Sequence, residues 1–182
     1  MMDFDTEKTA LVMVDIQERL FAAVPELAPM LPKVKMLLRS AAELRLPAVV
    51  TEQYPRGLGP TIPELKALLQ PGWPVIAKTD FSCWGVEAFR RELAAKKIRT
   101  VVLMGIECHV CVQQTAFDLQ AQGFDVVLAA DTVASRNAYD RQMALELMRS
   151  AGIGVTTAEA IVFAWLRTAK HPSFKAISAL VK

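Results

Sequence analysis

The hydrophobic positions of this chain fall into short continuous runs, separated by longer segments with helical periodicity. Apolar runs without alternation are typical of strands that are buried on both faces of a sheet. Six such strands are predicted, at residues 10–14, 47–50, 75–77, 100–104, 126–130 and 155–156. Because strands that alternate with helices form βαβ units, the pattern predicts parallel strands covered by helices on both faces.

The segments between these runs place apolar residues at every third or fourth position. This spacing predicts helices at residues 32–44, 86–95, 110–122, 138–150 and 172–181. Together the elements favour an α/β fold with three layers (α/β/α) and a doubly wound, mostly parallel, Rossmann-like sheet of about six strands. Residues 52–60 form a polar, turn-rich loop of the kind that is often functional. No repeat or linker divides the sequence, so we predict a single domain over residues 1–182.

Composition and charge narrow the partners that we expect. A hydrophobic fraction of 53% is above the usual average, which favours a folded domain and a homo-oligomer that buries the excess apolar surface. The basic residues are scattered, and the densest group, at positions 90–99, has no interleaved aromatic residues on which bases could stack. We therefore expect a small-molecule substrate and no nucleic acid partner.

The N-terminal residues are acidic and lack the basic and apolar regions of a secretory signal. No apolar run approaches the ~20 residues that a membrane span needs. The expected location is therefore cytoplasmic, with no membrane partner.

Three residues of complementary chemistry follow predicted strands. Asp15 follows the first strand, Lys78 the third, and Cys111 lies just past the fourth, at the start of a helix. In an open α/β sheet, ligands bind beyond the carboxyl ends of the strands. A helix N-terminus and a nearby ammonium favour the nucleophilic thiolate, and Asp15 could take the thiol proton and return it to a leaving group. The pattern indicates nucleophilic catalysis by a cysteine.

Two other functions fit parts of the sequence. The three cysteines are Cys83, Cys108 and Cys111, an odd number that argues against a disulfide framework. Cys108 and Cys111 form a C-x-x-C motif, which is also found in thiol–disulfide oxidoreductases; redox exchange needs both cysteines, whereas hydrolysis needs only Cys111. The motif lacks the second ligand pair of a zinc site. The third alternative is a non-catalytic, oligomeric interaction protein on the same fold.

Four segments resemble motifs of the isochorismatase-like cysteine hydrolase family. Residues 105–116 resemble its nucleophile motif, residues 11–17 its aspartate motif, residues 78–84 its lysine motif and residues 131–136 its Asp-Ala-x-x-Ser-Arg turn, with Thr132 in the alanine position. The motifs follow one another in the family's order through most of the chain. The resemblance implies a sheet with the strand order 3-2-1-4-5-6.

The resemblance also implies a role for individual residues. Cys111 would be the nucleophile, Asp15 the base and Lys78 the third member of a catalytic triad. The backbone N–H groups of Glu107 and Cys111 would form an oxyanion hole, next to a cis peptide bond between Ile106 and Glu107. On this strand order Asp15 and Cys111 lie on neighbouring strands, but the sequence does not show how Lys78 reaches them.

Residues 51–55, at the position of the metal-binding motif in nicotinamidases, indicate the branch of the family that this chain resembles. Nicotinamidases of the family use Asp-x-His and a further histidine, whereas this chain has only His109 and His171 and reads Thr-Glu-Gln-Tyr-Pro at 51–55. We therefore predict no metal and no cofactor. True isochorismatases lack the nucleophilic cysteine, and residues 51–65 resemble instead the isochorismatase-domain-containing proteins.

The expected reaction is hydrolysis of an amide or carbamoyl C–N bond in a small molecule, through a thioester-type intermediate. A thiol nucleophile paired with an acid–base carboxylate suits attack on such a carbon. The candidate residues of the substrate pocket are Gln17, Phe21, Tyr54, Phe81, Trp84 and His109.

Overall fold

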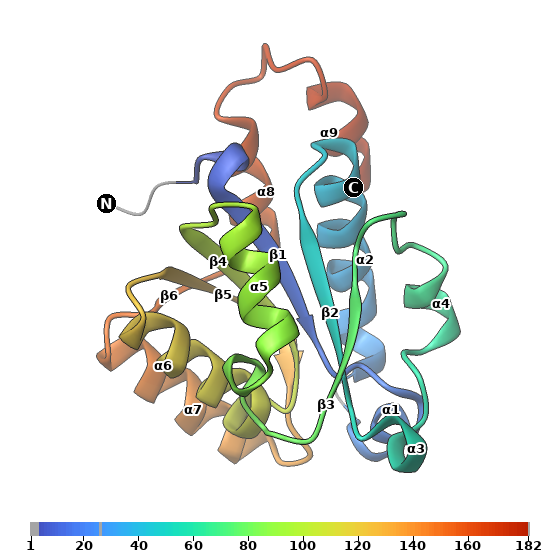
Figure 1. Ribbon diagram of the computed structural model, residues 1–182. Helices are drawn as coiled ribbons and strands as arrows, with labels where there is room; N and C mark the ends of the chain where they lie inside the picture. The colour runs from blue at the N-terminus through green and yellow to red at the C-terminus, as the bar shows by residue number, and fades with distance from the viewer. Residues whose placement is uncertain (1–3, 26, 182) are drawn as a thin grey trace.

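A computed structural model of the chain describes residues 4–25 and 27–181, and a central sheet between two layers of helices dominates it (Figure 1). The predicted single domain includes residues 1–3, 26 and 182, which lie outside the described residues. None of the helices within the described ranges combines the length and the apolar character needed to cross a membrane.

The sheet has six strands, all parallel, in the order β3-β2-β1-β4-β5-β6. This confirms the predicted α/β fold and strand order. Each predicted apolar run lies on a strand, except for Pro47, which precedes β2. The bounds are β1 Thr9–Val14, β2 Ala48–Gln53, β3 Val75–Lys78, β4 Thr100–Ile106, β5 Asp125–Ala134 and β6 Gly154–Thr156. The strand order reverses between β1 and β4, which places their carboxyl ends at the position where α/β sheets bind ligands.

Helices cover both faces of this sheet (Figure 1). Leu11 and Met13 of β1 belong to one buried cluster, and Val12 and Val14 belong to the other, so the central strand is buried on both sides. The first cluster includes residues of α2 Leu27–Glu43, α8 Ala158–Leu166 and α9 Phe174–Val181; the second includes residues of α5 Glu87–Ala95, α6 Gln113–Ala121 and α7 Ala138–Ser150. Burial of both faces explains why the strands read as continuous apolar runs.

Several elements differ from the sequence prediction. The helix α8 was not predicted, and α2 begins at Leu27, before the expected start. The loop expected at 52–60 is partly regular, because residues 52 and 53 complete β2 and Pro55–Leu58 form the short helix α3. Two other short helices, α1 Glu18–Ala23 and α4 Pro63–Lys66, precede and follow α3 along the chain.

Candidate active site

Asp15 directly follows β1 and is fully buried. Its backbone is left-handed, with φ of 52°, so the chain turns sharply at the end of the strand. Thr51 Oγ1 donates a hydrogen bond to Asp15 Oδ1 at 2.8 Å, and Lys78 Nζ lies 2.7 Å from Asp15 Oδ2. Each carboxylate oxygen therefore has a partner from a neighbouring segment, which fixes the orientation of the carboxylate.

Lys78 reaches Asp15 across the end of the intervening strand β2. It is the last residue of β3, where it pairs in register with Gln53 of β2. Its ammonium contacts Gln53 Oε1 at 2.6 Å and the carbonyls of Asp80 and Phe81 at 3.2 and 2.9 Å. The side chains of Lys78 and Asp15 are both 0% exposed, so the pair is a buried ion pair. The Lys78 side chain therefore extends past the carboxyl end of β2 to reach the Asp15 carboxylate.

Cys111 lies in a π-helical turn, Cys108–Val112, that opens onto α6. The N–H of Val112 donates to the Glu107 carbonyl five residues earlier, at 3.2 Å. Such π-turns occur often at functional sites. The predicted helix at 110–122 therefore begins as a π-turn, and this turn carries the candidate nucleophile.

The ionisation of the thiol differs from the expectation. Burial, followed by the charge of Asp15 and a side-chain hydrogen bond with it, raises the pKa of Cys111 to about 12, although Lys78 acts in the opposite direction. The resting residue is therefore a neutral thiol and not the thiolate that an ammonium alone would favour. Burial by itself lowers the pKa of Lys78, but Asp15 and the nearby cysteines raise it, and the net result is a pKa above the ordinary value. Lys78 is therefore an ammonium at neutral pH.

Glu107 forms the edge of the site between β4 and the π-turn. The peptide bond between Ile106 and Glu107 is cis. Arg136 donates from its backbone N–H and from Nε to Glu107 Oε1, at 3.0 and 2.9 Å. Burial opposes ionisation of Glu107, but these bonds and the charge of Arg136 lower its pKa below the ordinary value. Glu107 is therefore a charged, paired carboxylate at neutral pH.

Two of the candidate catalytic residues, Asp15 and Cys111, line one cavity of about 130 Å³. It is lined by Asp15, Leu20, Gln53, Leu58, Phe81, Ile106, Glu107, Val110 and Cys111. The carboxylate, the thiol and the chain around the cis bond therefore face one small space. Of the six residues predicted to form the substrate pocket, Phe81 lies here.

The other predicted pocket residues lie elsewhere. Gln17 is buried, and its amide bonds the backbone of residues 53 and 59. Phe21 packs against the hydrophobic cluster of α2, α8 and α9. Trp84 packs edge-to-face on Phe124, with ring centroids 5.7 Å apart. The contacts of these three residues are structural. They were predicted from their closeness to the motifs in sequence, which does not determine where a side chain points.

His109 and Tyr54 also lie outside this cavity. His109 Nδ1 is 2.9 Å from Ser135 Oγ, and its Nε2 is 4.0 Å from Asp140 Oδ2. Tyr54 is mostly exposed and lines a different, larger cavity. His109 thus contacts a residue just after β5 and a residue of α7, although it lies only two positions before Cys111.

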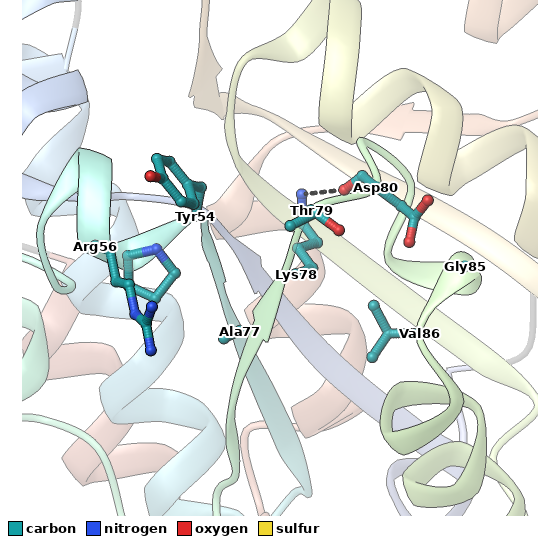
Figure 2. A pocket seen from close by; sticks show the side chains of 9 residues that line it. Tyr54, Arg56, Ala77, Lys78, Thr79, Asp80, Gly85 and Val86 are labelled. Atoms are coloured by element: carbon teal, nitrogen blue, oxygen red, sulfur yellow. Dashed lines mark hydrogen bonds between the residues drawn. The ribbon is translucent and has the colours of Figure 1, made fainter.

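The larger cavity, of about 570 Å³, lies beside the edge strand β3. Figure 2 shows Tyr54 and Arg56 on one side of it and Asp80 and Val86 on the other. The ammonium of Lys78 is bonded to the Asp80 carbonyl. The carboxylate and the thiol of the candidate site are not among its lining residues. Lys78 therefore lines the larger cavity, whereas Asp15 and Cys111 line the smaller one.

Sequence reasoning missed the residues that hold the site together. Thr51 and Gln53 bind the carboxylate and the ammonium, but in the sequence they appear only as polar residues near the end of a strand. Cys83 Sγ lies 3.7 Å from Thr51 Oγ1, and burial raises the pKa of Cys83 to about 11. One feature of the sequence indicated a role for Cys83, namely its position within residues 78–84, which resemble the lysine motif.

Among the described residues, no group of three or more His, Cys, Asp or Glu side chains is placed to hold a metal ion.

Residues 9–160 match the isochorismatase domain. The chain belongs to the isochorismatase family. It is 40% identical over 174 residues to isochorismatase domain-containing protein 1 of Salmo salar, covering 96% of this chain but 61% of the salmon protein. It is 41% identical over 174 residues to isochorismatase domain-containing protein 2 of Bos taurus, covering 94% of this chain and 82% of that protein. The chain thus spans less than two thirds of the salmon relative's length.

Solved structures of similar proteins have the same isochorismatase-family fold. The MAR1 ribonuclease from Caenorhabditis elegans has a TM-score of 0.92 at 36% identity, with 97% of this chain and 91% of that chain covered. YcaC from Pseudomonas aeruginosa, solved with hexane-2,5-diol and covalent acrylamide, has a TM-score of 0.90 at 26% identity, with 97% and 90% covered. YcaC from Escherichia coli, an octameric hydrolase of unknown specificity, has a TM-score of 0.90 at 27% identity, with 97% and 87% covered.

Proposed function

We propose that this protein is a cysteine hydrolase that cleaves an amide or carbamoyl C–N bond of a small molecule. The observation that carries the proposal is the convergence of Asp15, Lys78 and Cys111. The thiol and the carboxylate line one cavity, and the ammonium is 2.7 Å from the carboxylate. A nucleophile, a base within its reach and a third group that orients the base form the general arrangement for covalent catalysis.

Because the resting thiol is neutral, the first step needs a base to remove its proton, and we assign this role to Asp15. Cys111 Sγ attacks the substrate carbonyl carbon as its proton passes to the Asp15 carboxylate. Lys78 stays charged and stabilises the carboxylate before the transfer and the developing anion after it. The C–N bond then breaks, and the proton held by Asp15 passes to the leaving nitrogen. The acyl group remains on Cys111 as a thioester.

The second step regenerates the thiol. Asp15, again a carboxylate, takes a proton from a water molecule, which attacks the thioester carbon. The C–S bond breaks, and the Cys111 sulfur receives the proton from Asp15. The carboxylic acid product then leaves. We assign stabilisation of the oxyanion in both steps to the backbone N–H groups of Glu107 and Cys111, because both residues line the cavity.

The names of the relatives support parts of this proposal. The E. coli protein is described as a hydrolase, and the P. aeruginosa protein was solved with covalent acrylamide, a thiol-reactive amide. The C. elegans protein is named a ribonuclease. An RNA oligonucleotide therefore belongs beside amides and carbamoyl compounds in the first substrate panel. For this chain we favour small substrates because the cavity that holds the reactive groups is only about 130 Å³.

The test compares two cysteine variants in the same π-turn. Ammonia release from a panel of small amides is measured for the wild-type protein, Cys111→Ala and Cys108→Ala. We expect Cys111→Ala to lose at least about 1,000-fold in kcat/KM, as for removal of a catalytic nucleophile. For Cys108→Ala, kcat/KM should stay within about threefold of the wild-type value. The Cys108 thiol is buried, and neither Asp15 nor Lys78 affects its pKa.

Three outcomes contradict the proposal. Hydrolysis that survives in Cys111→Ala rules out this nucleophile. Loss of activity in both variants, together with a reducible bond between Cys108 and Cys111, supports the thiol–disulfide oxidoreductase alternative. No turnover of any panel member by the wild-type protein favours the non-catalytic alternative.

We also propose that the protein forms a homo-oligomer. Large apolar side chains remain exposed along one helix, α7, at Tyr139, Met143 and Leu147. An exposed apolar surface of this kind is suited to a subunit interface. The octameric E. coli protein shows that the fold supports such assembly in that relative. Sedimentation equilibrium measures the subunit number, and a monomer at all concentrations contradicts this proposal.

A further inference from the structure

Most of the residues that line the catalytic cavity are apolar. Five apolar residues line it, from α1, α3, the segment after β3, β4 and the π-turn: Leu20, Leu58, Phe81, Ile106 and Val110. Such walls offer a substrate contact area but no side-chain hydrogen bonds. The group that they contact in a bound substrate is therefore apolar, because an unpaired polar group there loses its water without compensation.

The charged groups at the cavity are already paired with each other. Lys78 Nζ lies within 3.2 Å of four oxygen atoms, on Asp15, Gln53, Asp80 and Phe81. An ammonium has three donors, so this cation has none left for a substrate carboxylate. The other ionisable side chain that lines the cavity, beside Asp15 and Cys111, is Glu107, a carboxylate paired with Arg136.

This charge distribution disfavours an anionic substrate. A substrate carboxylate would lose its hydration against apolar walls and would lie near two carboxylates without a free cation among the described lining residues. Both effects raise its free energy in the cavity. The product acid ionises at neutral pH, so the same effects promote its release.

The cavity volume limits the size of the acyl group. A dry apolar cavity of about 150 Å³ holds a molecule of benzene. The catalytic cavity, of about 130 Å³, is slightly smaller. The part of an acyl group that fits inside it is therefore about six carbon atoms or fewer.

We infer that the substrate is an uncharged amide with a compact, apolar acyl group. This inference rests on the proposed function and specifies the substrate class of the same site. Water converts such an amide into a carboxylic acid and ammonia or an amine, with no other reactant needed.

The charge preference is tested with two amides of nearly equal shape. In 3-methylbutanamide an isopropyl group occupies the place of the carboxylate of malonamate. We expect kcat/KM for 3-methylbutanamide to exceed that for malonamate by at least about 100-fold, because the ion must be desolvated without a partner. Equal or faster hydrolysis of malonamate overturns the inference, while the proposed hydrolase function stands.

The size limit is tested with octanamide and a cavity variant. We expect octanamide to react at least about tenfold more slowly than 3-methylbutanamide in kcat/KM. Leu58→Ala enlarges the cavity from the short helix α3 and should reduce this difference, whereas Val75→Ala, at an exposed valine of β3, should not. If Leu58→Ala does not fold, Phe81→Ala serves instead, because Phe81 is 54% exposed and its removal leaves no buried void. A wild-type preference for octanamide overturns the inference.

A second readout separates the pocket from the chemistry. Alkylation rates of Cys111 by acrylamide and by acrylate are measured by peptide mass spectrometry and divided by the rates for glutathione. We expect the normalised ratio to favour acrylamide by at least about 100-fold, for the same desolvation reason. If no amide is hydrolysed but this ratio is observed, the proposed function fails and the charge preference of the pocket stands. A ratio near one overturns the charge preference.

Discussion

At the scale of single residues, the catalytic arrangement depends on a fully buried ion pair. Lys78 and Asp15 are 2.7 Å apart and have no exposed side-chain surface. Taking two charges out of water is costly, and the pair is tolerated because Thr51 and Gln53 supply further hydrogen bonds. Removal of either member would therefore leave the other buried without its partner.

Removal of one partner should destabilise the protein strongly. Lys78→Met leaves the Asp15 carboxylate buried without its cation, and the free energy of unfolding should fall by about 3–5 kcal/mol. The double variant Asp15→Asn with Lys78→Met leaves no isolated charge and should recover at least half of this loss. Urea unfolding at pH 7 measures both. A single variant as stable as the wild type, or a double variant less stable than the single, contradicts this account of the pair.

The same residues mark the limit of what the sequence could predict about the site. Asp15, Lys78 and Cys111 were predicted to be close together because each follows a strand, and the structure brings them together. The route of Lys78 was not predictable, since it depends on side-chain contacts across β2. The neutral state of Cys111 was not predictable either, because burial outweighs the ammonium only in the folded protein.

At the scale of elements, the site depends on the close approach of β4 to β1. Gly105 of β4 has φ of 121°, and a Cβ atom at this position would lie 2.1 Å from the Val14 carbonyl oxygen. Val14 directly precedes Asp15, and Gly105 directly precedes the cis-linked residues 106 and 107. The glycine therefore lets the strand that carries the base lie against the strand that leads to the nucleophile.

Substitution of Gly105 should separate these strands. Gly105→Ala combines a disfavoured backbone angle with a clash against main-chain atoms, and we expect a loss of about 3–5 kcal/mol in stability. Gly123→Ala is the matched control. Gly123 has φ of 86° but no atom within 4 Å of the added Cβ, so it should lose only about 1 kcal/mol. Thermal and urea unfolding compare the two; equal losses would show that the contact with Val14 is unimportant.

The elements themselves were predictable to different extents. The strands were found because burial on both faces makes them continuously apolar. The helix α8 was missed because its sequence, Ala158–Leu166, is apolar nearly all round and so lacks a helical period. The helix α3 has four residues, too few for any period to appear. The π-turn has no sequence signature, because one extra residue in a turn depends on the packing around it.

At the scale of the whole molecule, three buried thiols link folding to alkaline pH. Burial raises the pKa of Cys83 to about 11 and those of Cys108 and Cys111 to about 12, from an ordinary value of 9.0. Above pH 9 the unfolded chain therefore releases protons that the folded protein keeps. The stability that these thiols contribute is fully present below pH 9 and is lost as the pH rises toward the folded pKa values. Lys78 acts in the same direction above 10.5.

We therefore expect the free energy of unfolding to fall steeply between about pH 9 and 11. Each protonated thiol contributes a slope of about 1.4 kcal/mol per pH unit, or about 4 kcal/mol for the three together. Cys108→Ala should reduce the slope by about one third, because Cys108 is fully buried and lies outside the catalytic contacts. Urea unfolding at several pH values measures the slope for both proteins. An identical slope in the variant would mean that Cys108 ionises in the folded state, contrary to its burial; a shallower slope makes the buried thiols the cause of the alkaline loss.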